Sequence, residues 1–401
     1  MSGRPSVQET LAALVGAGSC NPPGDERTVA AVVEQHAARL GLPRPRRLAA
    51  RPERPNLLIE VGAGSPRLLV GAHMDTVPAD PAAWTTDPWT LTERDGALQG
   101  LGAVDMKGAL AALLHALAAY AERPAAHGTV VAALTADEEA GSAEGMGWLC
   151  AEGHVRADAA VMVEASSQGV RSWDRLYVAE RGLCIVRVTV RGRPGHSSER
   201  VAVAERAPRR LVRCLSALWD AELGADARHP VDGMPPLFNV APVIRAGTIP
   251  TVYEETCHAL VEVRTVPGMS AEEVLAELER ALASTGLPRC WELELETWSP
   301  PTDPVRDTRL LNAARAAWEQ VLGTTPASGV FPAGTDAVHL AQIGIPTLSA
   351  FGPGSLASVH QADEALREDE LLTSITLFEA LIRRYHDGGA HRCPPGPAQR
   401  W

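Results

Sequence analysis

Residues 68–79 read LLVGAHMDTVPA, an apolar run that ends in a histidine and an aspartate two positions apart. In a β-strand, residues i and i+2 point to the same face, so His73 and Asp75 share one side of the chain. Open α/β sheets bind their ligands outside the carboxyl ends of their strands. The stretch therefore predicts a buried strand that delivers two polar side chains to the rim of a sheet. A structural hydrogen bond between a histidine and an aspartate fits the stretch equally well.

Length and composition indicate a globular protein with a net negative charge. The chain has 401 residues, of which 45% are hydrophobic and 21% charged, and its formal net charge is −12. This length suggests two domains. The acidic balance and the lack of a basic stripe argue against nucleic acid as a partner. The seven cysteines are scattered without a CxxC pair, which indicates free thiols in a reducing, cytoplasmic compartment.

The apolar runs and the N-terminal segment bear on membranes and secretion. The sequence contains no run of 18 apolar residues, so we expect neither a membrane span nor a membrane partner. Ser6 and Glu9 form an S-x-x-E capping box before an apolar run. That pattern favours an amphipathic first helix over a secretion signal.

Strands alternate with helices over the first part of the chain. The apolar runs predict strands at residues 56–61, 67–72, 128–136 and 159–165. A strong helical pattern covers residues 106–121, and a further helix is predicted between the last two strands. This alternation is typical of a mostly parallel, mixed α/β sheet sandwiched by helices.

The pattern changes near residue 177 and changes back near residue 299. Strands are predicted at 182–192, 239–245, 256–265 and 290–298, and helices at 203–223 and 271–284. The order is β-α-β-β-α-β, and the first of these strands alternates like a strand with one solvated face. We predict a ferredoxin-like α+β domain, residues 181–298, inserted into an α/β domain of residues 1–180 and 299–390. Residues 391–401 are expected to form a disordered tail.

Ionisable residues recur where the predicted core strands and turns end. They are His73, Asp75, Asp105, Glu138, Glu139, Glu164 and His360. Carboxylates packed together are unfavourable unless cations neutralise them, and histidine with carboxylate ligands suits zinc, cobalt or manganese. One of two adjacent glutamates can bind a metal while its neighbour acts as a general base. Asp75 is expected to hydrogen-bond the second ring nitrogen of His73. Taken singly, each motif also has a structural interpretation, such as a solvated acidic turn.

Six motifs follow one another along the chain. They are GAHMDTVPA, GLGAVDMKG, TADEEAGS, RGRPGHSS, PAGTDA and FGPGSLASVHQADE. Together they resemble the dinuclear-zinc amidohydrolase and exopeptidase family, which includes acetylornithine deacetylase, succinyl-diaminopimelate desuccinylase, aminoacylases and glutamate carboxypeptidases. The resemblance extends from CNPPGDE at 20–26 to Glu364. It implies a catalytic α/β domain with an inserted lid domain that also forms a homodimer interface.

The resemblance implies two zinc ions per subunit, with cobalt or manganese as alternatives. Asp105 would bridge the two ions. His73 and Glu164 would complete the shell of one ion, and Glu139 and His360 that of the other. In this family the peptide bond after the bridging aspartate is typically cis.

Further residues would act on the substrate. Glu138 would be the general base on the bridging water, and Asp75 would support His73. His196, from the inserted domain, would reach the neighbouring subunit's site and stabilise the oxyanion. Arg264 would bind a substrate carboxylate. The remaining contacts implied for the substrate or oxyanion are Asn239, Gly334 and Thr335.

The predicted activity is hydrolysis of a small N-acyl amino acid, as in acetylornithine deacetylase. A carboxypeptidase or dipeptidase would use the same site and is the alternative. A non-hydrolytic relative is less favoured, because all five ligand positions and Glu138 are present. One departure concerns the substrate pocket: Thr251 and Glu254 stand where the family usually has asparagine and proline.

Overall fold

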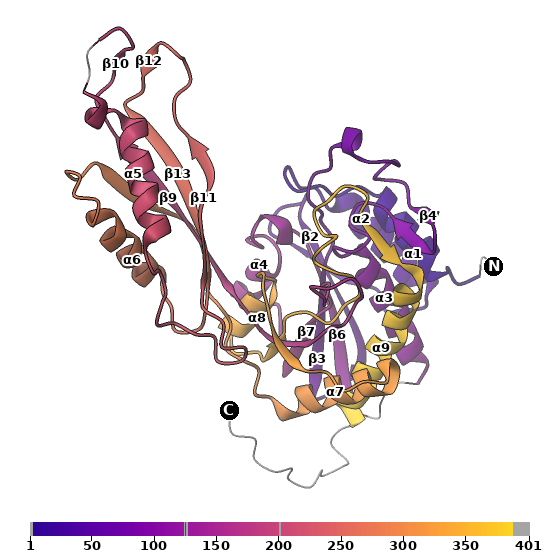
Figure 1. Cartoon of the computed structure of the whole chain (residues 1–401). Coiled ribbons are helices and arrows are strands. Elements are labelled where there is room, and N and C mark those ends of the chain that lie inside the picture. Colours follow the sequence, from indigo (N-terminus) through magenta and orange to yellow (C-terminus); the bar gives the residue numbers. More distant parts are fainter. Residues whose placement is uncertain (1–2, 124, 126, 200–201, 388–401) are drawn as a thin grey trace. The chain divides into compact units, whose positions relative to one another are not determined.

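The structure is a computed structural model that describes residues 3–123, 125, 127–199 and 202–387 (Figure 1). The tail predicted at 391–401 lies outside the described residues. The chain divides into two compact units. The first comprises Met1–Val178, Val305–Gly329 and Thr335–Trp401, and the second comprises Ala179–Pro304 and Val330–Gly334.

A mixed six-stranded sheet forms the centre of the first unit. In spatial order its strands are β1 (Arg46–Ala49), β2 (Pro55–Ala63), β6 (Gly128–Thr135), β3 (Arg67–His73), β7 (Ala159–Met162) and β16 (Thr347–Leu348). β3 pairs in parallel with both β6 and β7, and β7 with β16, whereas β2 is antiparallel to β1 and β6. The carboxyl ends of β3, β6 and β7 therefore meet at one edge of the sheet.

Helices cover both faces of this sheet (Figure 1). α4 (Met146–Ala151) and α8 (Ala337–Gln342) share an apolar cluster with Leu58 and Leu69 of the strands. The alternate strand residues Leu68 and Val70 are also buried, so the opposite face is covered as well. α3 (Lys107–Glu122) packs there against β2 and β3.

The remaining elements of the first unit surround this core. Four further helices are α1 (Val7–Gly16), α2 (Arg27–Arg39), α7 (Thr308–Leu322) and α9 (Glu368–Asp387). α1 and α9 pack on α3, and α7 packs on α9. The short strands β4 (Thr92–Arg94), β5 (Ala97–Gln99) and β17 (Ala365–Arg367) form a small sheet. β8 (Leu176–Glu180) pairs with β15 (Ser328–Phe331), and the residues of both strands fall partly in each unit. Among the described residues, no helix has both the length and the apolar character needed to cross a membrane.

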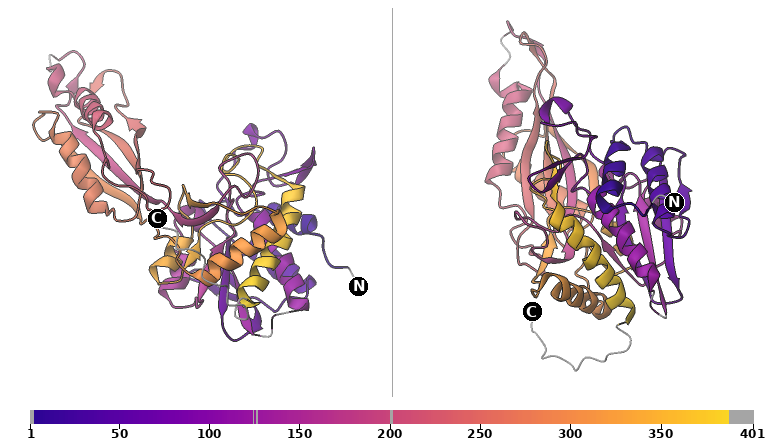
Figure 2. Two further views of the ribbon diagram at one scale, coloured as in Figure 1. Left: turned by 60° about the horizontal axis from the view of Figure 1, so that its bottom comes forward. Right: turned by 90° about the vertical axis from the view of Figure 1, so that its right-hand side faces the viewer.

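The second unit contains a four-stranded antiparallel sheet with the order β11-β13-β9-β14. Along the chain its elements are β9 (Gly182–Arg191), α5 (Ala207–Asp220), β11 (Leu237–Arg245), β13 (Thr256–Thr265), α6 (Ala271–Ala283) and β14 (Trp291–Ser299). Burial alternates along β9 and β13, because only one face of the sheet carries α5 and α6 (Figure 1, Figure 2). The ladder of β9 and β13 continues into two short strands, β10 (Gly195–His196) and β12 (Val252–Tyr253).

Candidate metal centre

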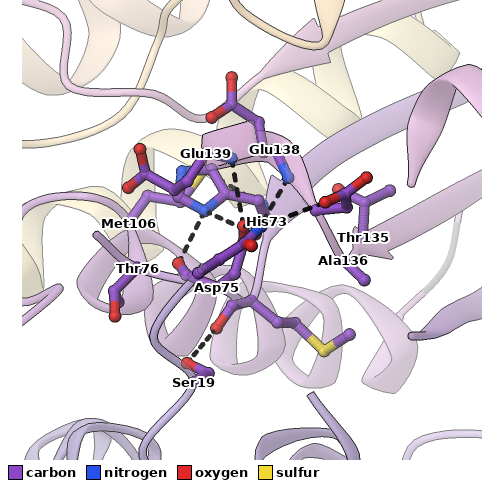
Figure 3. A network of polar contacts seen from close by, with 12 residues as sticks. Ser19, His73, Asp75, Thr76, Met106, Thr135, Ala136, Glu138 and Glu139 are labelled. Atoms are coloured by element: carbon purple, nitrogen blue, oxygen red, sulfur yellow. Dashed lines mark hydrogen bonds and ion pairs between the residues drawn. The ribbon is translucent and has the colours of Figure 1, made fainter. Parts of the chain in front are cut away.

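His73 is the last residue of β3 and is almost fully buried. Its Nδ1 lies 3.0 Å from the main-chain oxygen of Asp75, whereas the nearest carboxylate oxygen of Asp75 is 3.6 Å away. The predicted hydrogen bond between these residues therefore uses the backbone and not the side chain of Asp75. Both Asp75 carboxylate oxygens accept other bonds, from the main-chain N–H groups of Glu138 (3.2 Å) and Glu139 (3.1 Å) (Figure 3).

Asp105 lies in the turn that precedes α3, and its peptide bond to Met106 is cis, as the family resemblance implies. Its Oδ1 lies 2.9 Å from Nε2 of His73. Its Oδ2 lies 3.3 Å from Nε2 of His360, which comes from the loop before β17. The two oxygens of one carboxylate thus face two different histidines, which is the arrangement that a bridging ligand needs.

Each histidine also faces a second carboxylate. Nε2 of His360 lies 3.1 Å from Oε2 of Glu139, and Nε2 of His73 lies 3.8 Å from Oε1 of Glu164. One ligand atom from each of His73, Asp105 and Glu139 lies within 4.8 Å of the other two. Glu139 and Glu164 each have a buried Oε1 that accepts no hydrogen bond from the described residues. Because a buried acceptor without a donor is unfavourable, these residues fit a metal that takes nitrogen and oxygen ligands.

The electrostatics of the cluster also favour bound positive charge. Burial raises the pKa of Glu164 well above its ordinary value. Burial also opposes ionisation of Asp105, but hydrogen bonds from His360 and His73 hold the pKa of Asp105 below its ordinary value. Hydrogen bonds to Asp105 and Glu139 raise the pKa of His360 to about 10. Buried carboxylates clustered in this way are stabilised by positive charge, which a bound metal ion would supply.

Glu138 and Glu139 share a tight turn at the carboxyl end of β6. Asp137 has a left-handed backbone (φ 66°), and Glu138–Ala140 form one 3₁₀ turn. The two glutamate side chains leave this turn in different directions (Figure 3). Adjacent glutamates in this geometry can serve different roles, as the sequence predicts. Burial raises the pKa of Glu138 well above its ordinary value.

Sequence reasoning assigned no role to several residues that hold these turns. The carboxylate of Glu364 accepts main-chain N–H groups from Gly102 (3.0 Å), Val104 (2.6 Å) and Asp105 (2.9 Å). Glu364 is the last residue of the motif FGPGSLASVHQADE, so the sequence pattern already pointed to this position. Arg54, which is buried behind the Glu138–Glu139 turn, lies outside every motif quoted above.

His196 and Arg264 belong to the second unit and lie far apart within it. His196 lies on β10 opposite Val252, beyond the end of β13 that begins at Thr256. Arg264 lies eight residues along β13 from Thr256, which is about 27 Å at the usual rise of about 3.4 Å per residue. The two side chains therefore cannot contact the same small molecule within one chain.

The other residues predicted to contact the substrate are Asn239, Gly334 and Thr335, and they are divided between the two units. Asn239 on β11 pairs with Glu262, so it shares a sheet face with Glu262 and Arg264. Thr335 belongs to the first unit and accepts the N–H of Ala337 at 3.1 Å, whereas Gly334 belongs to the second unit.

The residues that depart from the family pattern lie near His196. The main-chain oxygen of Thr251 accepts the N–H of Ser197 at 2.8 Å. Glu254 accepts the N–H of Thr248 at 3.2 Å, so its carboxylate holds the loop before β12. This loop and His196 therefore form one end of the second unit.

Comparisons with known proteins agree with this geometry. Residues 69–384 match the profile of Peptidase family M20/M25/M40. A succinyl-diaminopimelate desuccinylase of Stenotrophomonas maltophilia is 33% identical over 340 residues, which cover 82% of this chain and 86% of that protein. An acetylornithine deacetylase of Edwardsiella ictaluri is 29% identical over 341 residues, which cover 82% of this chain and 83% of that protein.

Solved structures share the fold. An M20 family metallo-carboxypeptidase from Sulfolobus solfataricus superposes with a TM-score of 0.79 at 19% identity, covering 96% of this chain and all of that one. A Bacillus subtilis protein described as a dinuclear metal binding peptidase gives a TM-score of 0.67 at 16% identity, covering 94% of this chain and 96% of that one. These matches confirm the predicted family and the mixed α/β fold. The chain belongs to Peptidase family M20/M25/M40 and is a hydrolase of that family.

Proposed function

We propose that this protein hydrolyses the amide bond of N-acyl amino acids. The observation that carries the proposal is the geometry of Asp105, whose two oxygens face His73 and His360 on separate sides. Two curated relatives support the deacylase assignment, since their names describe removal of an acetyl or a succinyl group.

The residues of the cluster fit two divalent ions, with zinc as the first choice and cobalt or manganese as alternatives. Asp105 would be the shared ligand, His73 and Glu164 would complete one set, and Glu139 and His360 would complete the other. The dinuclear relative from Bacillus subtilis supports two ions over one. Bound metal ions of this kind polarise a carbonyl group and lower the pKa of water.

Glu138 is the proposed general base. It does not share the hydrogen bond that Glu139 makes with His360, and its side chain leaves the turn in another direction (Figure 3). Burial raises the pKa of Glu138 above that of an exposed glutamate, which makes its carboxylate a stronger proton acceptor. Glu138 would take a proton from the attacking water and give it to the leaving amine.

Arg264 is the proposed partner of a carboxylate beside the scissile bond. Its Nε donates to Oε1 of Glu262 at 2.7 Å. Its two terminal nitrogens form no hydrogen bond with the described residues, so they can bind a carboxylate in a bidentate way. Asn239 shares the same sheet face and is a second candidate for contact with the substrate.

We propose that the second unit is a lid and dimerisation domain, and that His196 serves the partner's site. Nδ1 of His196 accepts the N–H of Ser198 at 3.2 Å, so in the neutral ring Nε2 carries the proton and can donate to an oxyanion. His196 and Arg264 can act on one substrate only if two chains contribute them. The edge strand β11 and helix α5 expose large apolar side chains, which supports an interface there: Val212, Trp219, Leu237 and Ile244.

Amine release from a substrate panel tests the proposed function. The panel contains N-acetylornithine, N-succinyl-diaminopimelate, several N-acetyl amino acids and several dipeptides, each with a free carboxylate and as the primary amide. Each is measured with added zinc or cobalt and again with a chelator. We expect metal-dependent cleavage of one N-acyl class and a large loss when the carboxylate is amidated.

The other outcomes of the panel contradict specific parts of the proposal. Cleavage of dipeptides alone would assign the protein to the exopeptidases. Equal cleavage of amidated and free substrates would remove the role of Arg264. If the protein binds two metal ions and cleaves nothing in the panel, the N-acyl amino acid assignment is wrong, and the loop of Thr251 and Glu254 becomes the first place to look for a different substrate.

A further inference from the structure

We infer that Asn21 and Arg54 form a positioning network that fixes the turn carrying Glu138 and Glu139. The inference rests on the proposed function, because this turn matters for catalysis only through those two glutamates. Neither Asn21 nor Arg54 hydrogen-bonds the side chain of a proposed metal ligand. Their effect must therefore pass through the turn.

The first anchor of the turn is Asp137, which has an uncommon backbone. Its φ of 66° lies in the left-handed region, which is uncommon for residues other than glycine. Its Oδ2 accepts the N–H of Glu144 at 3.0 Å, which closes the far side of the turn. Its Oδ1 faces Nδ2 of Asn21 at 3.2 Å and a terminal nitrogen of Arg54 at 3.3 Å.

Asn21 joins this anchor to a second one. Its Nδ2 also donates to Oδ2 of Asp75 at 2.9 Å, and Asp75 accepts the N–H groups of both Glu138 and Glu139. The side-chain amide of Asn21 therefore links Asp137, which precedes the turn, to Asp75, which binds the backbone of the turn. Asn21 and Asp75 are both almost fully buried, so water does not compete for these bonds.

Arg54 orients Asn21 and balances the charge around it. The Arg54 side chain is buried, and a terminal nitrogen donates to Oδ1 of Asn21 at 3.1 Å. The acceptor role of Oδ1 fixes which way the Asn21 amide points, so its nitrogen must face Asp75 and Asp137. Arg54 also lies 2.6 Å from Glu26 and 3.3 Å from Glu144. A guanidinium can serve four such partners at once, whereas a lysine ammonium cannot reach them in the same geometry.

Asn56, on β2, is a third anchor of the same turn. The side chain of Asn56 accepts the N–H of Ala136 at 3.0 Å and donates to the main-chain oxygen of Glu144 at 2.9 Å. The turn is thus held at both of its ends and at its two amides. Small shifts of a catalytic group cost rate, and a displacement of about 1 Å costs about 100-fold.

The test compares Asn21→Leu, Arg54→Lys and Arg54→Met with the parent enzyme. For each we measure kcat and KM on the best substrate of the panel, zinc affinity by competition with a chromogenic chelator, and the melting temperature. Asn21→Leu keeps the side-chain volume and removes the amide donor. We expect it to lower kcat and zinc affinity about 10- to 100-fold and to leave KM nearly unchanged. Arg54→Lys should fall between the parent and Arg54→Met.

His36→Ala is the matched control, since it removes a buried polar side chain without touching the turn. His36 lies in α2, and its Nδ1 lies 3.1 Å from Oγ1 of Thr10. This variant should melt at a lower temperature and keep the parent's kcat and zinc affinity. If Asn21→Leu behaves in the same way, the network only stabilises the fold and the inference is wrong.

Two further outcomes distinguish failure of this inference from failure of the proposed function. If Asn21→Leu does not fold, Arg54→Lys decides: lower kcat and zinc affinity support the inference, and parent values of both contradict it. If the parent enzyme cleaves no substrate, the proposed function fails on its own. The zinc competition then still shows whether Asn21 and Arg54 act on the turn.

Discussion

Glu138 carries the chemistry of the proposed reaction in one side chain. Glu138→Gln keeps the shape of the residue and removes its ability to accept a proton. We expect kcat to fall about 10²- to 10⁴-fold while bound zinc is retained, because Glu138 is not a proposed ligand. Steady-state kinetics and metal analysis of the purified variant check this. Glu152→Gln, an exposed glutamate in the turn after α4, is the control and should leave both unchanged. Activity near the parent level in Glu138→Gln would rule out its role as the base.

Glu26 makes the stability of the protein depend on pH. Burial and the charge of Asp75 raise its pKa from 4.5 to about 7, in spite of the bond from Arg54. Folding therefore favours the protonated carboxyl, so the stability contributed by this group is present below the unfolded pKa and is lost as the pH rises through about 7. Glu26→Gln mimics the protonated form at every pH. Its gain in melting temperature over the parent should be larger near pH 8 than near pH 5, and an equal difference at both pH values would contradict the raised pKa.

The sequence predicted the members of the site better than their hydrogen bonds. Strand ends and turns identified the residues that the structure gathers in the first unit, although their catalytic roles stay predictions. The predicted bond between His73 and Asp75 exists, but through the main-chain oxygen of Asp75, and the sequence does not show that the Asp75 carboxylate instead accepts the main-chain amides of Glu138 and Glu139. Arg54 and Asn21 were missed for a related reason: their partner Asp137 is distant in the sequence, and no local pattern links the three.

At the scale of elements, the edge strand β11 is the feature most open to a partner. Ile244 is 50% exposed on β11, and Trp219 is 57% exposed on α5, which reaches β11 through a hydrogen bond from Trp219 Nε1 to Val240. We expect Ile244→Lys to convert a dimer to a monomer, measured by light scattering after size exclusion, with little change in melting temperature. Leu295→Lys on the opposite edge strand, β14, is the control, since Leu295 is 40% exposed. If Ile244→Lys stays a dimer, the interface lies outside the exposed face of β11.

Long elements with a clear period were predictable, and short or interrupted ones were not. The strand predicted at 256–265 is β13 with the same bounds, because alternation over ten residues leaves little freedom in register. The helix predicted at 203–223 begins only at Ala207, because Pro208 favours the first turn of a helix and residues 203–205 form a separate 3₁₀ turn. Strands of two residues, such as β10, exist only through pairing with a distant partner and leave no pattern of their own.

At the scale of the whole molecule, the separation of His196 and Arg264 predicts active sites shared between two chains. Glu138→Gln and His196→Ala should each be inactive alone, the first for lack of a base and the second for lack of an oxyanion donor. In a mixed dimer, the His196→Ala chain keeps its own Glu138 and receives an intact His196 from its partner. That one site should be active, and the other site should be dead.

Subunit exchange between the two inactive variants measures this directly. Random exchange makes half of the dimers mixed, with one working site of two, so activity should rise to about a quarter of the parent level. If His196 acted within its own chain, every site in the mixture would lack either the base or the donor, and no activity would appear. Repeating the exchange with Ile244→Lys added to both chains should abolish the recovery, because those chains are expected to stay monomeric. Recovery in these chains would mean that they still pair, so Ile244 would lie outside the interface that brings His196 to the partner's site.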